Sequence, residues 1–570
     1  MVVLGNPPYA NFGRMNRNKW ILGLLNDYKK DLKEKKLNLD DDFIKFIRFA
    51  QWRIEKTGHG IVGFITNNSY IDGITHRRMR ETLMKAFDEI YIFDLHGSSK
   101  KKERTPDGGK DENVFDITVG VSILLAARIE KAAKPSEERA PARVFHAELW
   151  GDRKGKYDWL SQNDAKTTSW KELEPAPPSY FFVPKTCFEE VEYNDHQHIR
   201  DMFFVFGQGV KTERDGVSVH FEEQDVEQTI QDFCELDEQA IRDRYKLGPD
   251  SRDWKISNAK ADVKMNRDSN LFRSILYRPF DIRYTWYSGQ TLGFIGTPGF
   301  SVMRHMTAGP NLAMMVSRQA SRGYRHVFIS KTLANVNALD TAGLFGSGPF
   351  FPLYIYSSAD ELGVSVGRRP NLSPEFLKAL AEKLKLPQTG PYGLPQGVTP
   401  EDIFHYTYAV FHSPMYRKRY AEFLKIDFPR LPLTSDRDLF FRLAASGGEL
   451  VTLHLMESPK LNDPITEFPV KGTQVVEKVR YNDEDGQVWI NPTQYFGGVP
   501  QAVWDFHIGG YQVCEKWLKD RKGRKLTYED TRHYQQIIVA LHETIRLMTE
   551  IDTVIGQHGD WPAAFSTKGT

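Results

Sequence analysis

Hydrophobic and polar positions alternate along the first 130 residues in the manner of an α/β layer fold. Short apolar runs predict four strands, at residues 2–5, 60–66, 90–95 and 118–126. Residues 42–56 carry apolar side chains at helical spacing up to Gly58 and Gly60, and residues 76–87 predict a second helix. Strands and helices that alternate at this spacing indicate a mostly parallel sheet that is covered on both faces.

The remainder of the chain shows a different pattern. Residues 129–141 and 174–179 are rich in Ala, Pro and charged residues, which is typical of linkers. Residues 205–356 favour short strands and turns, and helical periodicity dominates beyond a boundary near residue 360. Helices are predicted at residues 373–386, 400–412, 414–425, 437–456 and 530–555. We therefore predict a sheet domain, a strand-rich region and a mainly helical part, at residues 1–150, 180–360 and 361–570.

The composition excludes several classes of protein. Lys and Arg number 76 against 75 Asp and Glu, so the formal charge is +1 and any surface for nucleic acid must be local. Cys187, Cys234 and Cys514 lack the spacing of a disulfide framework or of a cysteine-built zinc site. No apolar run is long enough to cross a bilayer, and the N-terminus does not look like a secretory signal. We expect a cytoplasmic protein with no membrane partner.

The tetrapeptide Asn6-Pro7-Pro8-Tyr9 follows the first predicted strand, where it has a chemical interpretation. An amine conjugated to a ring is a weak nucleophile, and two acceptors for its N–H groups make its lone pair available. The Asn6 side-chain oxygen and the Pro7 carbonyl supply such acceptors in a fixed relation, because the prolines restrict the backbone. Tyr9 offers a face on which a base turned out of a duplex stacks. The alternative is a turn in which Asn-Pro-Pro only ends strand pairing.

These residues resemble the motif of the N6-adenine DNA methyltransferases, which is Asn or Asp, then Pro, Pro, and Tyr, Phe or Trp at a strand end. The next helix, strand and hairpin of those enzymes are similar to residues 42–56, 60–69 and 114–125. The resemblance implies that residues 1–150 form a partial Rossmann-like methyltransferase sheet with Asn6, Pro7, Pro8 and Tyr9 as catalytic residues. It also implies that Phe115 stacks on the opposite face of the flipped base, although a core position explains Phe115 nearly as well.

Later segments resemble the C-terminal part of single-polypeptide type I restriction-modification proteins, called type ISP. The likeness is carried by residues 206–215, 277–281, 351–356 and 509–522, and the similarity runs over nearly the whole chain. In that family, the part after the methyltransferase recognises the DNA target. The resemblance therefore implies a mixed α/β target-recognition region with a helical C-terminal part.

S-adenosylmethionine is the cofactor that the resemblance implies, but its main binding motif is not found in this chain. A glycine-rich loop and a ribose-binding acid are expected before the Asn6 strand. Phe206-Gly-Gln-Gly209 imitates such a loop, yet charged residues follow where a helix should begin, so we interpret it as the start of the recognition region. We expect a partner, an upstream polypeptide or domain that carries this motif and, as in type ISP enzymes, a helicase and a nuclease. The isolated chain is expected to be inactive.

Double-stranded DNA is the expected partner of one local basic segment. Between residues 267 and 331, nine Lys or Arg accompany two acids, a local charge of +7, and ten aromatic residues are interleaved. Guanidinium groups suit phosphates and base edges, so DNA contacts are predicted for Arg278, Arg283, Arg322 and Arg325. The alternative is a strand core with solvated arginines. The His196-Gln-His198 pair lacks further ligands, so no metal site is predicted.

Together these observations predict a site-specific DNA methyltransferase that transfers a methyl group from S-adenosylmethionine to adenine N6 in a restriction-modification system. A DNA specificity module without catalysis of its own is the alternative, because the cofactor motif was not found. A protein glutamine methyltransferase uses the same tetrapeptide but ranks last, because here a long chain follows the motif. The DNA target sequence and the oligomeric state are not indicated.

Overall fold

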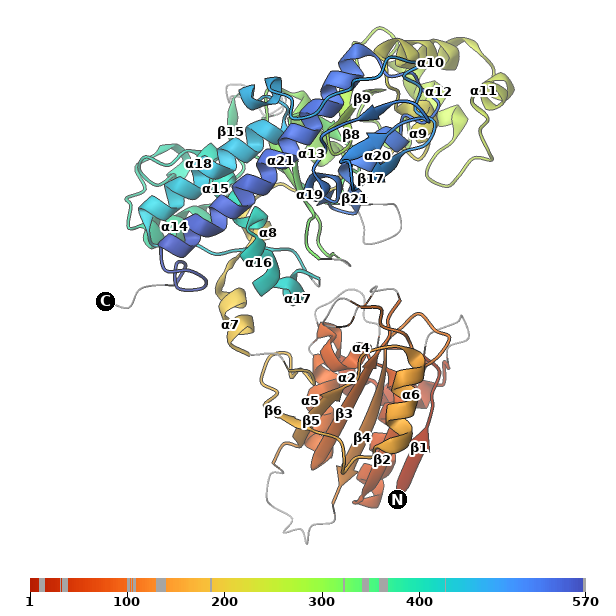
Figure 1. Cartoon of the computed structure of the whole chain (residues 1–570), viewed down its shortest axis with the longest axis vertical. Coiled ribbons are helices and arrows are strands. Elements are labelled where there is room, and N and C mark those ends of the chain that lie inside the picture. Colours follow the sequence, from red (N-terminus) through yellow and green to blue (C-terminus); the bar gives the residue numbers. More distant parts are fainter. Residues whose placement is uncertain are drawn as a thin grey trace. The chain divides into compact units, whose positions relative to one another are not determined.

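The chain divides into two compact units, Met1–Glu190 and Val191–Thr570 (Figure 1). This computed structural model describes residues 1–9, 16–30, 32, 39–99, 103, 105, 109–129, 140–184, 187–320, 323–340, 348–357, 367–425 and 427–566. The helix α7 (Cys187–Asp195) contains the point of division.

The first unit is built on a six-stranded mixed sheet in the order β1-β2-β4-β3-β5-β6. Its strands are β1 (Val2–Gly5), β2 (Gly60–Asn67), β3 (Glu89–His96), β4 (Val121–Arg128), β5 (Arg143–Glu148) and β6 (Lys171–Leu173). The β1–β2 and β3–β5 pairings are parallel, and the other three pairings are antiparallel. The four predicted strands are confirmed, but the sheet is mixed, because β4 follows β3 without a crossover helix and must return antiparallel.

Helices cover both faces of this sheet. They are α1 (Lys19–Leu24), α2 (Asn26–Lys29), α3 (Asp42–Thr57), α4 (Ser69–Asp72), η1 (Ile74–His76), α5 (Arg77–Ala86) and α6 (Arg153–Gln162). Side chains of α3 and α5 share one buried cluster with Ile92 of β3. On the opposite face, Trp159 of α6 stacks on Phe93 with the ring centroids 5.1 Å apart. The predicted helices at residues 42–56 and 76–87 are confirmed with small changes of bounds.

The segment after the fourth strand continues the first unit. The strands β5 and β6 extend the sheet, and residues 174–179 end in a segment that is fixed against α5. The Arg80 guanidinium donates hydrogen bonds to the carbonyls of Ser179 and Tyr180, at 2.5 and 2.9 Å. The linker predicted at residues 174–179 is therefore wrong, because its irregular backbone is held by a buried arginine that lies far away in the sequence. Most of the other predicted linker, residues 129–141, lies outside the described residues.

The second unit combines small sheets with long helices, which confirms the predicted mixed α/β fold with a helical C-terminal part. Its strands are β7 (Gln197–His198), β8 (Phe272–Arg278), β9 (Asp281–Trp286), β10 (Ala313–Val316), β11 (Val327–Ser330), β12 (Leu333–Ala334), β13 (Phe350–Pro352), β14 (Tyr354–Tyr356), β15 (Arg368–Pro370), β16 (Arg430–Leu431), β17 (Arg480–Asn482), β18 (Gln487–Trp489), β19 (Tyr495–Phe496), β20 (His507–Ile508) and β21 (Tyr511–Gln512).

Long helices dominate the part beyond residue 370, where α15, α18 and α21 pack side by side (Figure 1). The helices of the second unit are α8 (Ile199–Met202), α9 (Asp215–Ser218), α10 (Glu223–Glu235), α11 (Glu238–Tyr245), α12 (Ile256–Met265), α13 (Phe300–Thr307), α14 (Pro374–Leu384), η2 (Pro391–Gly393), α15 (Pro400–His412), α16 (Pro414–Arg419), α17 (Ala421–Leu424), α18 (Arg437–His454), η3 (Pro459–Asn462), α19 (Gln501–Trp504), α20 (Val513–Lys519) and α21 (Tyr528–Gln557). None of the helices in the described part of the chain has the length and apolar character that crossing a bilayer requires.

The helices α10 to α13 correct the prediction that residues 205–356 form mostly short strands and turns. In α10, Val226, Ile230 and Phe233 face the core at helical spacing and are buried. The exposed positions of this helix carry Glu, Asp and Gln, so the polar composition of the segment concealed its periodicity.

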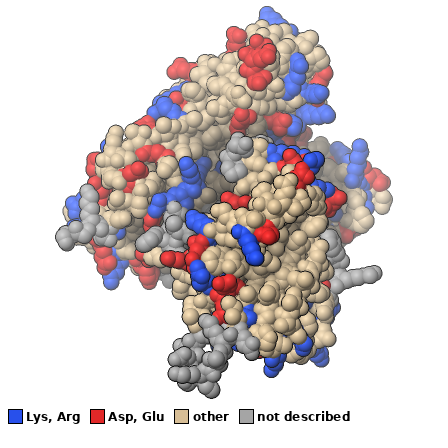
Figure 2. All heavy atoms as spheres, turned by 60° about the horizontal axis from the view of Figure 1, so that its bottom comes forward, with Lys and Arg blue, Asp and Glu red and all other residues tan. Residues whose placement is uncertain are grey.

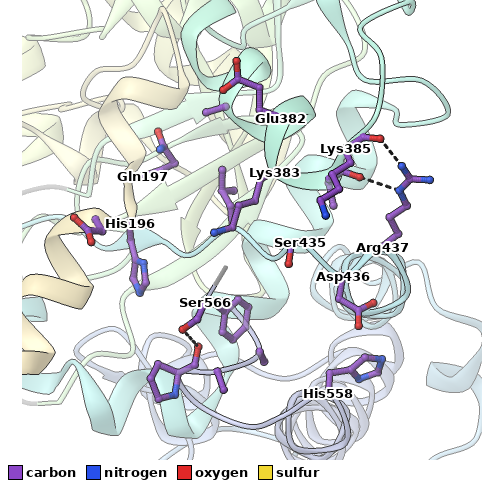
Figure 3. Close-up of a pocket in the computed structure, with 18 of the residues that line it drawn as sticks. His196, Gln197, Glu382, Lys383, Lys385, Ser435, Asp436, Arg437, His558 and Ser566 are labelled. Carbon is purple, nitrogen blue, oxygen red and sulfur yellow. Dashed lines mark hydrogen bonds between the residues drawn. The ribbon is translucent and has the colours of Figure 1, made fainter. Parts of the chain in front are cut away.

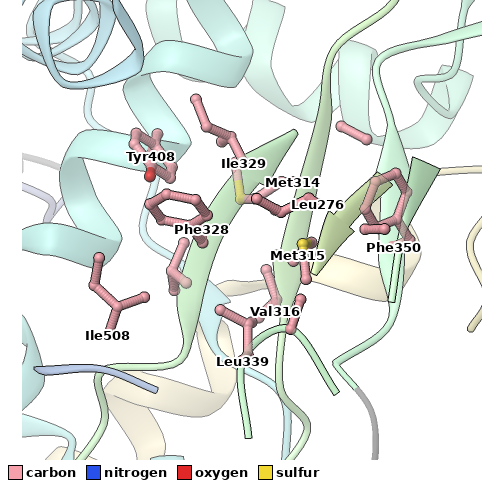
Figure 4. Close-up of a cluster of buried hydrophobic side chains, with 14 of the residues drawn as sticks. Leu276, Met314, Met315, Val316, Phe328, Ile329, Leu339, Phe350, Tyr408 and Ile508 are labelled. Atoms are coloured by element: carbon pink, nitrogen blue, oxygen red, sulfur yellow. The ribbon is translucent and has the colours of Figure 1, made fainter. Parts of the chain in front are cut away.

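The core of the second unit is continuous across residue 360. All four side chains of β10 and all four of β11 are buried, so this sheet is covered on both faces. Figure 4 shows Met314 and Ile329 from these strands beside Phe328 and Tyr408, the latter from α15. The boundaries at residues 150, 180 and 360 were drawn to separate regions of different function. That functional division stays a prediction.

A buried histidine, His454 of α18, joins α15 and α21 through hydrogen bonds. The Tyr408 hydroxyl donates to Nδ1 of His454 at 2.5 Å, and Nε2 of His454 lies 2.9 Å from the Thr544 hydroxyl. Nδ1 of His412 lies 2.7 Å from the Tyr408 carbonyl oxygen. Burial lowers the pKa of His454 to about 3, and nearby Arg417 adds to this effect. The folded unit therefore holds His454 neutral.

This network predicts a loss of stability in acid. An unfolded histidine takes up a proton near pH 6.5, whereas folded His454 stays neutral until about pH 3. The unfolded state thus binds more protons, and the free energy of unfolding falls by about 1.4 kcal/mol per pH unit for this group as pH decreases below 6.5. Urea unfolding of the second unit between pH 7.5 and 5 should show a shallower pH slope in His454→Gln, and an unchanged slope in His542→Gln at an exposed position of α21. Equal slopes in the parent and His454→Gln would contradict this account.

Candidate target-base site

The Asn6-Pro7-Pro8-Tyr9 segment lies at the carboxyl end of β1, where the parallel strand β2 also ends. Asn6 and Pro8 are exposed, Pro7 is buried, and Tyr9 is half-buried. The side-chain amide of Asn67, the last residue of β2, donates to the Tyr9 carbonyl at 3.0 Å. Ligands of sheets of this kind bind outside the carboxyl ends of parallel strands. The fold thus places the tetrapeptide where a substrate can reach it.

Asn6 and Tyr9 are joined by a short hydrogen bond. The Tyr9 hydroxyl donates to Oδ1 of Asn6. Burial raises the pKa of the Tyr9 hydroxyl well above its ordinary value, against the smaller opposite effect of the hydrogen bond with Asn6. Tyr9 therefore keeps its proton near neutral pH, and the Asn6 oxygen acts as an acceptor.

The ring of Phe115 lies next to that of Tyr9, although 106 positions separate them in the sequence. The ring centroids are 5.4 Å apart, and the planes are tilted by 46°. Both rings pack against the cluster of Phe93, Leu95, Val114 and Val121 on the α6 face of the sheet. The structure therefore brings together the two residues for which stacking on a target base is predicted.

The loop that carries Phe115 is held by residues that the sequence did not single out. Arg153, Lys156 and Tyr157 of α6 all donate hydrogen bonds to backbone carbonyls in or beside this loop. A cavity of about 670 Å³ lies at the same loop and is lined in part by Asn113, Phe115 and Arg153. These contacts join residues more than 35 positions apart, so neither a motif nor a spacing revealed them.

The four arginines predicted to contact DNA do not share one environment. Arg283 is 8% exposed and is paired with Asp281 through Nη2, at 2.8 Å, while Asp520 lies 3.7 Å away. The Arg278 guanidinium lies over the Tyr277 ring, 3.9 Å from its centroid. Arg325 is exposed, and Arg322 lies outside the described residues. Contact with DNA stays a prediction for all four, but Arg283 also has a structural role.

The charged surface is mixed on the face shown in Figure 2, where Lys and Arg of the described residues are interspersed with Asp and Glu. A cavity of about 1140 Å³ in the second unit is mixed as well. Its wall includes Lys383, Lys385, Arg437, His196 and His558 (Figure 3). Five acidic side chains accompany those three Lys and Arg, so this cavity does not suit a phosphate backbone.

The two histidines of the His196-Gln-His198 pair have different partners. Nε2 of His196 lies 3.1 Å from the Tyr420 hydroxyl, and His198 accepts from the Arg200 amide at the start of α8. Within the described ranges, no group of three or more His, Cys, Asp and Glu side chains is arranged to hold a metal ion.

Two family models match the chain. The model described as "Type ISP C-terminal specificity domain" matches residues 201–550, which is more than half of the chain. The model described as "Eco57I restriction-modification methylase" matches residues 1–100. No curated protein matches the chain.

Three solved structures share the fold. They are the ATP-dependent type ISP restriction-modification enzyme LlaBIII bound to DNA (TM-score 0.66, 20% identity), the DrdV–DNA complex (0.65, 22%), and a nuclease-deletion mutant of the type ISP enzyme LlaGI with a DNA substrate mimic (0.64, 19%). Each likeness covers 96% of this chain. The chain spans 37%, 56% and 52% of the lengths of those three proteins, respectively.

Proposed function

The chain belongs to the type ISP C-terminal specificity-domain family, and on that basis we propose that it methylates adenine N6 at a specific DNA sequence. The observation that carries this proposal is the pairing of two features at one sheet edge. Asn6 and Pro7 directly follow β1, with the Asn6 side chain exposed and Pro7 buried, and the rings of Tyr9 and Phe115 lie 5.4 Å apart. The second unit, which contains the specificity-domain match, would read the target sequence.

Asn6 and Pro7 would hold the amine of the target adenine. The Asn6 Oδ1 and the Pro7 carbonyl would each accept one N–H, which directs the nitrogen lone pair away from the ring plane. Among the described residues, no backbone hydrogen bond to the Pro7 carbonyl is present. Oδ1 of Asn6, which accepts from the Tyr9 hydroxyl here, has a second lone pair that can accept an N–H of the adenine amine.

Tyr9 and Phe115 would stack on the two faces of the flipped base. A base between two rings requires about 7 Å between them, since stacked atoms approach to about 3.5 Å. The observed centroid distance of 5.4 Å is shorter. One of the two rings must therefore move by about 2 Å when the base enters.

S-adenosylmethionine is the methyl donor that this reaction requires. Residues 206–209, which resemble its glycine-rich binding loop in sequence, do not have the surroundings of such a loop. A Cβ atom at Gly209 would lie 2.5 Å from the Ala334 carbonyl oxygen, and one at Gly207 would lie 2.8 Å from Val302. These glycines are needed for close packing inside the second unit, and they are not free to surround a ligand.

The free edge of β1 would receive a strand from the partner that binds the cofactor. Among the described residues this strand pairs only with β2, and its Val2 and Leu4 side chains are 65% and 74% exposed. An unpaired edge with exposed apolar side chains invites a further strand. The matched enzymes are longer than this chain, which is consistent with such a partner.

DNA binding by the second unit gives a test of the arginine prediction. Arg325→Ala should lower the slope of log affinity against log salt by about 1, because an exposed cation that contacts a phosphate releases one counterion. Lys378→Ala, on the exposed face of α14, serves as a control for surface charge. Fluorescence anisotropy of a labelled duplex at several salt concentrations measures both slopes. If Arg325→Ala keeps the parent slope, this arginine does not contact DNA.

Methyl transfer itself decides between the proposal and its alternative. The chain, extended by the sequence encoded upstream of Met1, would be incubated with labelled S-adenosylmethionine and a random-sequence duplex. The proposal expects label in the DNA, recovered as N6-methyladenine by mass spectrometry. Sequence-selective DNA binding without any methyl transfer would favour the specificity module without catalysis, which the match over residues 201–550 supports.

A further inference from the structure

One face of α6 is directed at the loop that carries Phe115. Arg153, Lys156 and Tyr157 are spaced i, i+3 and i+4, so they project from the same side of the helix. α6 lies outside both family matches, which cover residues 1–100 and 201–550. Neither match therefore gives this helix a role.

Arg153 and Tyr157 hold the backbone on both sides of the Phe115 Cα. The Arg153 Nε donates to the Asn113 carbonyl at 2.8 Å, and its Nη2 donates to the Phe115 carbonyl at 3.1 Å. The Tyr157 hydroxyl donates to the Val114 carbonyl at 2.6 Å. Three successive carbonyls, those of residues 113 to 115, are thus fixed by two side chains.

Lys156 anchors the start of the same loop. Its ammonium pairs with Oδ1 of Asp111 at 2.7 Å, and both side chains are 0% exposed. The remaining two donors of Lys156 bind the carbonyls of Leu95 at 2.8 Å and Glu112 at 2.7 Å. The charge is fully compensated, so the end of β3, the loop and α6 form one rigid connection.

We propose that α6 is a positioning helix, whose residues Arg153, Lys156 and Tyr157 hold Phe115 opposite Tyr9 for the flipped adenine. This inference rests on the proposed function. The hydrogen bonds of these side chains to the loop end on backbone carbonyls, so they act on the base through Phe115 and are positioning residues.

The hydrogen bonds from Arg153 and Tyr157 to residues 113–115, here called the clamp, affect how the base enters. Because the backbone of residues 113–115 is fixed, the roughly 2 Å by which the rings must part is taken up by side-chain torsions of Phe115 and by Tyr9. A loop released from α6 would instead let Phe115 drift, and the flipped base would lose one of its two stacking partners. Release should therefore reduce base capture and leave duplex binding by the second unit intact.

The test uses the full chain with substitutions at exposed positions. The Arg153 side chain is 38% exposed and Tyr157 is 47% exposed, so Arg153→Met with Tyr157→Phe should keep the fold while removing three hydrogen bonds to the loop backbone and the ion pair of Arg153 with Asp116. The matched control is Lys154→Met on the same helix, whose side chain is 85% exposed and, among the described residues, forms an ion pair with Asp158 alone. Lys156 is left in place.

Two measurements are made on each variant. Hydrogen exchange of the amides at residues 113–117 reports the clamp without DNA. Time-resolved fluorescence of 2-aminopurine reports base capture, with the probe placed opposite an abasic position in a duplex, where flipping costs least. In the double variant we expect faster exchange and an unchanged duplex affinity. Captured 2-aminopurine should fall about tenfold, because the net contribution of the lost hydrogen bonds corresponds to a factor of about that size. Lys154→Met should match the parent in all three.

Each contrary result has its own meaning. Unchanged exchange in the double variant would show that α6 does not hold the loop. Faster exchange with unchanged capture would show that the held loop does not position Phe115, and either result overturns the inference. If the parent chain binds the duplex but never captures 2-aminopurine, the proposed function fails, and the inference fails with it. This outcome differs from the other two because it is seen with the parent chain alone.

Discussion

Asn6→Ala should lower the rate of methyl transfer to adenine by about 10² to 10³, the loss that follows removal of one preorganised polar group at a reacting centre. Asn6 is exposed directly after β1, and its side chain bonds to the nearby Tyr9 hydroxyl, so its removal should leave the fold and the duplex affinity unchanged. Single-turnover transfer of labelled methyl groups, with the cofactor-binding segment supplied, measures the rate. A duplex titration by fluorescence anisotropy measures the affinity.

Two matched variants sharpen this prediction. Asn163→Ala removes a side-chain amide at the end of α6, away from the tetrapeptide, and should keep the parent rate. Tyr9→Phe keeps the stacking ring but removes the hydroxyl that donates to Asn6, so it should also stay active. If Asn6→Ala transfers methyl groups as fast as the parent, Asn6 does not hold the target amine.

Lys156→Met should lower the free energy of unfolding of the first unit by about 3–5 kcal/mol, the usual cost when one partner of a buried ion pair is removed. Both Lys156 and Asp111 are fully buried, and methionine would leave the Asp111 charge without its cation. Asp111 keeps the amides of Gly97 and Gly151, at 2.7 and 2.9 Å, which places the expected loss toward the lower end.

The measurement must follow the first unit alone, because a chain with two compact units does not unfold in one step. Hydrogen exchange of β3 and β4 in increasing urea provides that probe. The control is again Lys154→Met, which loses only an exposed pair with Asp158 and should change the stability by less than about 1 kcal/mol. An unaltered urea midpoint for β3 and β4 in Lys156→Met would show that the buried pair contributes no net stability.

Local patterns predicted the first half of the sheet well. The helix α3 and the strands β1 to β4 were found because their apolar residues recur at one period and because glycine ends the helix, as Gly58 does with a φ of 79°. The order of the strands in the sheet could not be predicted in the same way. β4 lies between β2 and β3, and this placement depends on long-range pairing that no local period contains.

The missed elements have physical explanations. In α10 the residues Val226, Ile230 and Phe233 recur at helical spacing, but they lie among eight acids between residues 221 and 238, and the sequence predicted short strands and turns there. Acids in the first turn stabilise a helix, so the same composition also favoured α10. This helix was predictable from period and charge taken together.

The site was predictable only in part. The tetrapeptide and Phe115 followed from a motif, and the structure places Tyr9 and Phe115 side by side. The environment of Arg283 did not follow, because its neighbour Asp281 is shared with Arg521, 240 positions away from Asp281. Long polar side chains that bind remote carbonyls, such as Arg153, leave no periodic signal in a single sequence.

The most direct test of the central claim is a structure of the chain bound to the duplex that it selects from a random pool. The account predicts one adenine turned out of the duplex, with its exocyclic nitrogen about 2.7–3.2 Å from both the Asn6 Oδ1 and the Pro7 carbonyl oxygen. The base should lie between the rings of Tyr9 and Phe115. A duplex bound by the second unit with every adenine still paired, or a flipped base held away from Asn6, would contradict it.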